Sequence, residues 1–257
     1  MVIVGAIICI NTGYSISKII LAGISAGLTA SAGNVINDII DKNADKINHP
    51  ERPLPSGKIS VRLAVIEYLV LVVSAVAISF FINRLALNVV LLTTVLLLIY
   101  STRLKRIPLL GNFTIAFLTG FAFIYGGVAV DNPRAAVIPA LFAFFINFIR
   151  ELVKDLQDIR GDSAAGIKTF PNQFGIVPTK YFITFLTIVL IAATVYPFIY
   201  KIYNIEFFVV VMILVNPLLV YVLKSLYDNN EPANLIKLSN LLKLDMVFGL
   251  AAIFFGR

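Results

Sequence analysis

The sequence predicts an all-α protein that crosses a membrane several times. Of its 257 residues, 59% are hydrophobic and 14% are charged, and the mean hydropathy is +0.93. A soluble domain has roughly a quarter of its residues charged. The apolar runs lack strand-like alternation and are too long for the strands of a barrel, so helices must satisfy the backbone hydrogen bonds in lipid. We therefore expect a polytopic helical membrane protein.

Nine apolar segments follow one another along the chain, and each is a candidate membrane helix. A span needs about 20 residues, so the first segment predicts a shortened helix. No linker or change of composition separates the segments, and we expect one domain over residues 1–257. The segments cover residues 1–11, 16–40, 61–82, 86–101, 111–130, 134–155, 178–200, 205–226 and 239–256.

The basic residues predict the orientation of the chain. The formal net charge is +7, and most of the 21 Lys and Arg residues lie in four regions. By the positive-inside rule these regions are cytoplasmic. Because the positive charges occupy short loops between spans, they indicate topology and contact with phosphate or anionic lipid, not nucleic acid. The four regions are residues 42–62, 101–110, 150–180 and 224–243.

One Cys and one His exclude two kinds of site. A disulfide framework needs an even number of Cys residues, and a zinc site of the Cys/His type needs about four ligands. The chain has only Cys9 and His49. We interpret Cys9 as a packing residue and His49 as a solvated loop residue, with a role for His49 as a base or a phosphate contact as the alternative. The composition therefore excludes a disulfide framework and a Cys/His zinc site.

A first acidic cluster (Asp38, Asp41 and Asp45) lies where the second apolar segment ends. Two asparagines, Asn34 and Asn37, precede Asp41 and Asp45 at steps of three and four, which places these four side chains on one helical face. Carboxylates at the end of a membrane span are unfavourable unless a cation or a water-filled cavity compensates them. The cluster therefore indicates a divalent metal that binds a diphosphate.

A second acidic cluster (Glu151, Asp155, Asp158 and Asp162) closes the sixth segment. Its members are four, three and four residues apart, so we expect them on one face of one helix. Both clusters end even-numbered segments and would lie at the same membrane surface. Facing acidic stripes repel each other unless cations lie between them, and oxygen ligands beside a phosphate-rich substrate favour Mg²⁺. A solvated helix end is the alternative for either cluster alone.

Several basic side chains share this surface and are candidates for binding phosphate. Arg can hold phosphate oxygens with two parallel hydrogen bonds, whereas Lys acts as a point charge. Topology signalling and lipid contact are the alternative for each of them. Two tyrosines, Tyr100 and Tyr125, are candidates for lining a cavity or for anchoring at the membrane interface. The basic candidates are Lys46, Arg52, Lys105, Arg106, Arg150 and Lys154.

These motifs resemble those of a known family. The Asn and Asp spacing over residues 37–45, followed by Arg-Pro-Leu-Pro-Ser-Gly at 52–57, is similar to the first signature of the UbiA superfamily of intramembrane prenyltransferases. The Asp spacing over residues 155–162 is similar to the second signature. The resemblance covers most of the chain, and the stretch 150–171 is closest to the archaeal digeranylgeranylglyceryl phosphate synthases. One departure is the first helix, which is fuller in the family.

The resemblance implies both an architecture and a reaction. Nine transmembrane helices would surround a central cavity that opens to the cytoplasmic side of the cell membrane and to lipid. A geranylgeranyl group would pass from geranylgeranyl diphosphate to the free hydroxyl of geranylgeranylglyceryl phosphate, with Mg²⁺ as the cofactor. This step forms the second ether bond of archaeal membrane lipids and releases diphosphate. The implied partners are these substrates and membrane lipids, with no nucleic acid and no evident protein partner.

The resemblance also assigns roles to the candidate residues. Those implied in catalysis and in metal binding are Asn37, Asp41, Asp45, Asp158 and Asp162. Those implied in binding the diphosphate or phosphate are Lys46, Arg52, Lys105, Arg106, Arg150 and Lys154. Further candidates are Asn34, Asp38, Tyr100, Tyr125 and Asp155.

Three other functions are compatible with parts of the pattern. A prenyltransferase of the same superfamily that acts on an aromatic or other acceptor shares both signatures, because acceptor choice depends on the shape of the pocket. A transporter also has intramembrane carboxylates, although these usually lie near the middle of the bilayer in broken helices. A CDP-alcohol phosphotransferase uses membrane Asp clusters with Mg²⁺, but its Asp-Gly…Ala-Arg…Gly pattern is not found here.

Overall fold

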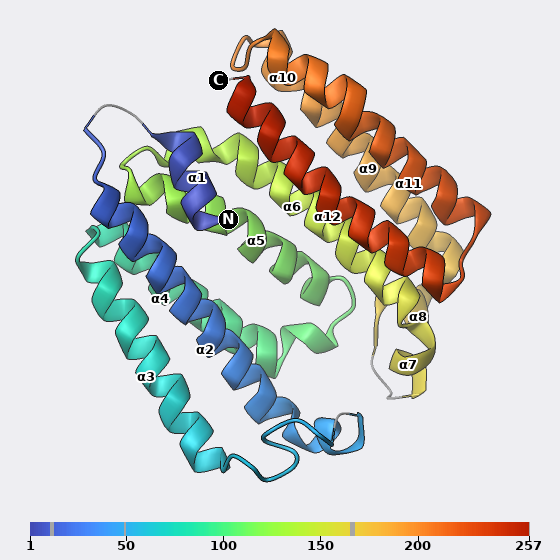
Figure 1. Ribbon diagram of the computed structural model, residues 1–257. Coiled ribbons are helices and arrows are strands. Elements are labelled where there is room, and N and C mark those ends of the chain that lie inside the picture. The colour runs from blue at the N-terminus through green and yellow to red at the C-terminus, as the bar shows by residue number, and fades with distance from the viewer. Residues whose placement is uncertain (11–12, 49, 165–167, 257) are drawn as a thin grey trace. The chain divides into compact units, whose positions relative to one another are not determined.

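The computed structural model describes residues 1–10, 13–48, 50–164 and 168–256 (Figure 1). Helices and turns, with no strand, make up this part of the chain. Eight of its helices are long and apolar enough to cross a membrane. The prediction of an all-helical, multi-pass membrane protein is confirmed.

The chain folds into two compact units, each made of two stretches of sequence. The first unit comprises Met1–Lys105 and Ala122–Ala136, and the second comprises Arg106–Phe121 and Val137–Arg257. Helix α5 (Leu110–Ala129) contributes its first part to the second unit and its last part to the first. The single domain and the central cavity expected from the sequence stay predictions.

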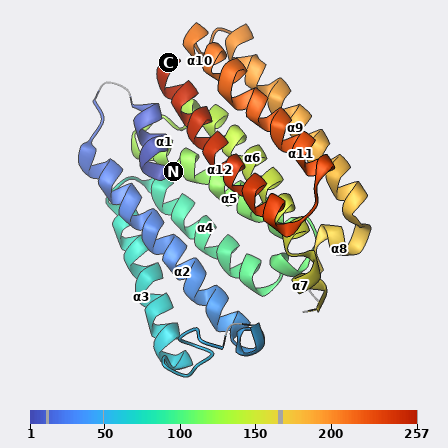
Figure 2. The ribbon, with the colours of Figure 1, turned by 45° about the vertical axis from the view of Figure 1, so that its right-hand side comes forward.

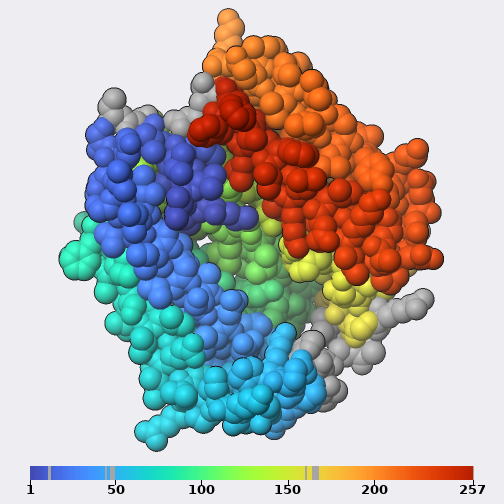
Figure 3. Space-filling view, viewed as in Figure 1, coloured from blue at the N-terminus to red at the C-terminus, as the bar shows by residue number. Residues whose placement is uncertain are grey.

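In the first unit, the long helix α2 (Ile16–Asn48) packs against α3 (Val61–Phe80) and α4 (Arg84–Thr102). The three helices lie side by side in both views (Figures 1 and 2), and α2 and α3 form a continuous surface (Figure 3). Side chains cap the two shorter helices: Ser60 accepts a hydrogen bond from the Leu63 amide, and Asn83 accepts one from the Ala86 amide. Many large apolar side chains of α3 and α4 are exposed, as expected of a surface that faces lipid.

The first apolar segment forms helix α1 (Val2–Cys9), which has eight residues. At 1.5 Å per residue it is about 12 Å long and cannot cross a hydrocarbon core of about 30 Å. It packs against α2 and against the 3₁₀ turn η2 (Pro133–Ala136). The first of the nine segments expected from the sequence is thus helical but shorter than a span, as predicted.

In the second unit, α6 (Val137–Gln157) packs against α9 (Ile176–Ile199) and α12 (Pro232–Phe255). Helix α12 runs antiparallel to α6 (Figures 1 and 2) and also contacts the three elements that precede it. Leu238, Leu242 and Ile253 of α12 are fully buried and belong to the core of this unit. The remaining elements are α7 (Ile159–Ala164), α8 (Phe170–Phe174), α10 (Ile205–Val210), the π-helical turn η3 (Val211–Val215) and α11 (Asn216–Asp228).

Two helix boundaries differ from those expected from the apolar pattern, and one expected helix is interrupted. Helix α2 continues past residue 40 to Asn48, and α12 begins at Pro232 instead of residue 239. Hydropathy marks the stretch that lies in lipid, whereas a helix continues through polar residues until a residue such as Pro50 stops it. Proline is compatible with the first turn of a helix, which explains the early start of α12. The prediction that the second acidic cluster lies on one helix is wrong, because α6 ends at Gln157 and α7 begins at Ile159.

Candidate active site

The first acidic cluster lies on the polar end of α2. This helix has 33 residues and is therefore about 50 Å long, which exceeds the thickness of the hydrocarbon core. Its apolar span is Ile16–Asn43, so Asp41 lies in the last turn of the span and Asp45 lies beyond it. The length of α2 thus carries carboxylates from the membrane span into the polar turns that follow it.

A lysine from another helix bridges the amide and the carboxylate of α2. Lys105 lies in the 3₁₀ turn η1 (Leu104–Arg106), directly after α4, which packs against α2. Its Nζ donates to Asn37 Oδ1 at 2.8 Å and to Asp41 Oδ1 at 2.6 Å. The Lys105 side chain is 16% exposed and that of Asp41 is 28% exposed, so water screens this ion pair less than a surface pair. Two oxygens, one turn apart on α2, converge on one cation.

The other two carboxylates of the first cluster bind Arg52. Its Nη1 lies 2.9 Å from Asp45 Oδ2 and 3.9 Å from Asp38 Oδ1. The Asp45 side chain is only 10% exposed, whereas that of Arg52 is 45% exposed. Asp45, which the sequence placed on the face of Asn37 and Asp41, thus has a different cationic partner from theirs.

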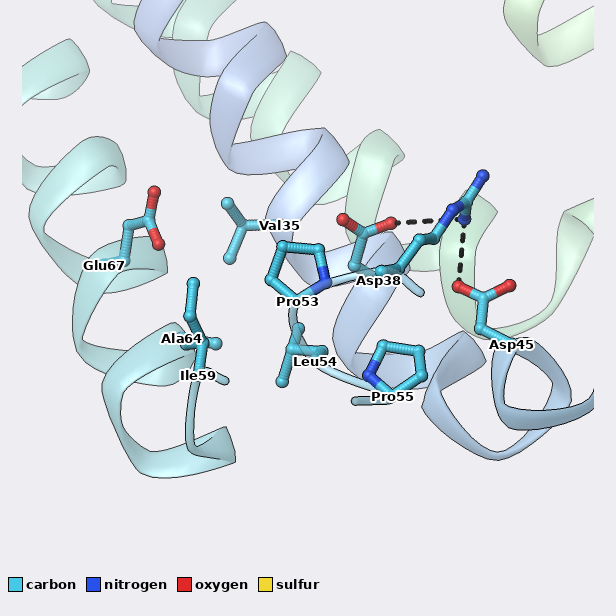
Figure 4. Close-up of a pocket in the computed structure, with 10 residues that line it drawn as sticks. Val35, Asp38, Asp45, Pro53, Leu54, Pro55, Ile59, Ala64 and Glu67 are labelled. Atoms are coloured by element: carbon cyan, nitrogen blue, oxygen red, sulfur yellow. Dashed lines mark hydrogen bonds and ion pairs between the residues drawn. The ribbon is translucent and has the colours of Figure 1, made fainter. Parts of the chain in front are cut away.

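These groups line a pocket of about 190 Å³ between the end of α2, the following loop and the start of α3. Figure 4 shows Asp38 and Asp45 on the α2 side of the pocket and Glu67 of α3 on the other side. The loop that closes it turns back on itself: the Ser56 amide donates to the Arg52 carbonyl, and Gly57 has φ 78°. A positive φ is readily adopted by glycine, so the turn at 52–57 holds Arg52 against the acids.

In the second acidic cluster, Glu151 binds two cations of its own helix. Arg150 Nη1 lies 2.9 Å from Glu151 Oε1, and Lys154 Nζ lies 3.2 Å from Glu151 Oε2. Asp155, one turn further along α6, accepts a hydrogen bond of 2.9 Å from Asn112 Nδ2 of α5. The basic and acidic candidates of α6 therefore contact one another, and Asn112 holds one oxygen of Asp155.

Asp158 and Asp162 lie at the junction of α6 and α7. The Asp158 amide donates to the Lys154 carbonyl and the Asp162 amide donates to the Asp158 carbonyl, so the helical bonding pattern continues through the break. Asp158 is exposed and accepts from Gln157 Nε2, and Asp162 is half-buried. Burial raises the pKa of Asp162, and the nearby Asp158 carboxylate raises it further. Neither forms an ion pair with a described side chain.

The remaining candidates lie on α2, α4, α5 and η1. Tyr100 is half-buried at the end of α4, and Tyr125 is buried in α5, where its hydroxyl hydrogen-bonds to Ser25 of α2. Tyr125 therefore joins two helices of the first unit. His49 lies outside the described residues. Three other candidates are exposed: Asn34, Lys46 and Arg106.

Asn112 is a polar residue near a membrane span, for which the sequence predicts a hydrogen bond between helices, and it forms one with Asp155. The sequence patterns missed Asp245 altogether. Asp245 of α12 is 1% exposed, and neither carboxylate oxygen has a hydrogen-bond partner among the described residues. The available signal was a lone Asp in the last apolar run, because ionisable residues within membrane spans are rare. Among the same residues, no three Asp, Glu, His or Cys side chains are grouped to hold a metal by themselves.

The comparison with known families identifies the fold that carries these residues. Residues 1–244 match the model of the UbiA prenyltransferase family. The chain belongs to this family. A solved structure of digeranylgeranylglyceryl phosphate synthase superposes with a TM-score of 0.87 and 34% identity, over 99% of this chain and 91% of that one. A UbiA homologue from Archaeoglobus fulgidus, bound to GPP and Mg²⁺, has the same fold (TM-score 0.68, 19% identity, 98% and 94% covered).

Curated relatives agree with the family. The digeranylgeranylglyceryl phosphate synthase of Methanopyrus kandleri is 41% identical over 156 residues, which are 61% of this chain and 58% of that enzyme. The chain thus matches less than two thirds of the length of this relative. The stretch that resembles the first family signature lies at the polar end of α2, and the stretch that resembles the second lies at the junction of α6 and α7.

Proposed function

We propose that this protein is a Mg²⁺-dependent prenyltransferase that forms an ether bond. It would transfer a geranylgeranyl group from geranylgeranyl diphosphate to the free hydroxyl of geranylgeranylglyceryl phosphate. The observation that carries the proposal is the convergence of Asn37 and Asp41 on one cationic nitrogen at the polar end of a membrane helix. The names of the relatives above, and the GPP and Mg²⁺ bound to the Archaeoglobus fulgidus homologue, support it.

The donor groups fit a hard divalent cation. Amide and carboxylate oxygens are ligands that Mg²⁺ accepts, and the Lys105 ammonium already occupies the position of a cation between two of them. Mg²⁺ typically takes one or two carboxylates and completes its shell with water and substrate phosphate, so Asn37 and Asp41 could supply the first protein ligands of such a shell. When bound, the metal neutralises the charge that develops on the leaving diphosphate. The residues that would hold it are Asn37, Asp41, Asp45, Asp158 and Asp162.

The basic side chains would bind the diphosphate of the donor and the phosphate of the acceptor. Lys46 and Arg106 are exposed and can contact phosphate oxygens directly. Arg52, Arg150 and Lys154 are already paired with carboxylates, so phosphate must share them with those acids or replace them. These ion pairs hold the cationic side chains in place before the substrate arrives. Substrate binding therefore costs less side-chain entropy.

Aromatic side chains of the second unit are suited to hold a prenyl chain. Phe113 and Phe117 of α5 stack 6.5 Å apart and are partly exposed, and Phe144 and Phe148 of α6 contact Phe113 edge-on. This apolar surface begins one residue after Asn112, the partner of Asp155. A polyisoprenoid lying on it would place its diphosphate end near the polar ends of α5 and α6.

The reaction exchanges one C–O bond for another. The bond between the allylic carbon and the diphosphate oxygen breaks, and the electron pair leaves with the diphosphate. The acceptor hydroxyl oxygen then bonds to that carbon, and its proton passes to the released diphosphate or to water. Apolar walls exclude bulk water, which would otherwise capture the allylic cation. The richness of the flanking loops in Lys and Arg supports a site on the cytoplasmic side.

The test is product analysis with a matched pair of variants. Purified protein receives geranylgeranyl diphosphate, geranylgeranylglyceryl phosphate and Mg²⁺, and mass spectrometry detects the digeranylgeranyl ether. Asp41→Asn should lower turnover about a hundredfold or more, because it removes a charge that the proposed metal needs. The control is Asp131→Asn, the same change at an exposed loop residue whose positive φ asparagine tolerates.

Two results would contradict the proposal. Wild-type protein that forms no ether with this acceptor, but prenylates an aromatic acceptor, would assign it to another branch of the family. Asp41→Asn with wild-type turnover would remove Asp41 from the metal site.

Treatment with EDTA should abolish turnover and added Mg²⁺ should restore it.

A further inference from the structure

The position of Lys105 makes it an internal cation of the proposed metal site. Its ammonium accepts no hydrogen bond and offers three donors, of which two point to Asn37 Oδ1 and Asp41 Oδ1. Because Lys105 is mostly buried, its charge acts on these oxygens with little screening. The other carboxylates of α2 have Arg52 as their cation. Among the side chains of α2 that the structure describes, Lys105 thus hydrogen-bonds to Asn37 and Asp41.

An ammonium and a divalent metal cannot both use these two oxygens. A metal bound at about 2.1 Å from each oxygen would lie almost where the Lys105 nitrogen lies, and like charges that close repel by several kcal/mol. The two cations therefore exclude each other. Metal binding must displace the Lys105 ammonium. The displaced ammonium then needs a new anionic partner, because little water reaches it.

We propose that Lys105 keeps free divalent metal out of the Asn37–Asp41 site until a diphosphate arrives. The diphosphate oxygens then accept the displaced ammonium, so metal and diphosphate bind as one cooperative unit. The inference rests on the proposed function and adds the order in which its ligands bind. By linkage, the factor by which diphosphate tightens metal binding equals the factor by which metal tightens diphosphate binding.

The length and flexibility of the Lys105 side chain make the transfer possible. A lysine carries a point charge on a four-carbon stem, so it can move from carboxylate to phosphate without a change in the backbone. Its neighbour Arg103 is exposed and makes no ion pair with a described side chain. Arg103 therefore provides a control with the same charge, two residues away on the same segment.

The experiment measures metal binding in place of activity. Mn²⁺ serves as the spectroscopic probe, and its binding to purified protein in detergent is titrated by electron paramagnetic resonance. Each titration is repeated with inorganic pyrophosphate. Lys105→Met should bind Mn²⁺ alone about tenfold or more tightly than the wild type. Pyrophosphate should then tighten Mn²⁺ binding strongly in the wild type and much less in Lys105→Met.

The control variants determine whether the effect belongs to Lys105. Arg103→Gln removes the same charge and should leave both Mn²⁺ affinities as in the wild type. Lys105→Arg keeps the charge and should also bind free Mn²⁺ weakly, and it remains informative if Lys105→Met does not fold. Equal Mn²⁺ affinity in Lys105→Met, Arg103→Gln and the wild type overturns the inference. The Mn²⁺ titrations do not measure ether formation. A protein that forms no ether would overturn the proposed function, whatever its Mn²⁺ affinities are.

Discussion

Replacement of Asp245 by alanine should stabilise the protein. Asp245 is fully buried in α12, and neither of its oxygens has a hydrogen-bond partner among the described residues. A buried polar atom without a partner costs about 1–3 kcal/mol. Alanine removes both oxygens, and the small gap that it leaves costs on the order of 1 kcal/mol. We therefore expect a net stabilisation on the order of 2 kcal/mol. For a chain of this size, that corresponds to a rise in Tm of about 4–8 °C.

The matched control is Leu242→Ala, one turn earlier on the same buried face of α12. Leucine makes only apolar contacts, so its truncation should destabilise the protein by about 2–5 kcal/mol and lower the Tm. Both variants are compared with the wild type by thermal unfolding in detergent, followed by intrinsic tyrosine fluorescence. The reasoning fails if Asp245→Ala lowers the Tm as Leu242→Ala does, because Asp245 would then have a stabilising partner.

Two further changes test the contacts described above. Asn112→Ala removes the hydrogen bond to Asp155 and should lower turnover while the Tm falls by only a few degrees, corresponding to about 1–2 kcal/mol. Wild-type turnover in this variant would remove Asn112 from the site. Gly126→Ala should lower the Tm sharply, because its Cβ would collide with the backbone of Val2 in α1. Gly27 of α2 has open space around it, so Gly27→Ala should raise the Tm slightly through the higher helix propensity of alanine. Equal changes of Tm in Gly126→Ala and Gly27→Ala would contradict the assigned packing.

Much of the fold was predictable because it depends on local composition. The run of apolar residues over Val61–Phe80 specifies a membrane helix wherever it lies in the protein, since lipid leaves the backbone no other hydrogen-bond partners. The helix ends were less predictable. The polar residues from Asp41 to Asn48 leave the apolar span but continue α2 as a helix. At Asp158 the spacing of carboxylates indicated one continuous helix, whereas this residue separates α6 from α7.

The sequence by itself determined that acidic side chains gather at the ends of two apolar helices, because residues three and four apart share a helical face. Only the tertiary structure decided their partners. Lys105 follows Asp41 by 64 residues and reaches it because α4 packs against α2. Likewise, Asp155 receives its hydrogen bond from Asn112 on another helix, and Asp245 has no partner among the described residues. Periodicity specifies the direction of a side chain, but packing over long sequence distances determines what that side chain meets.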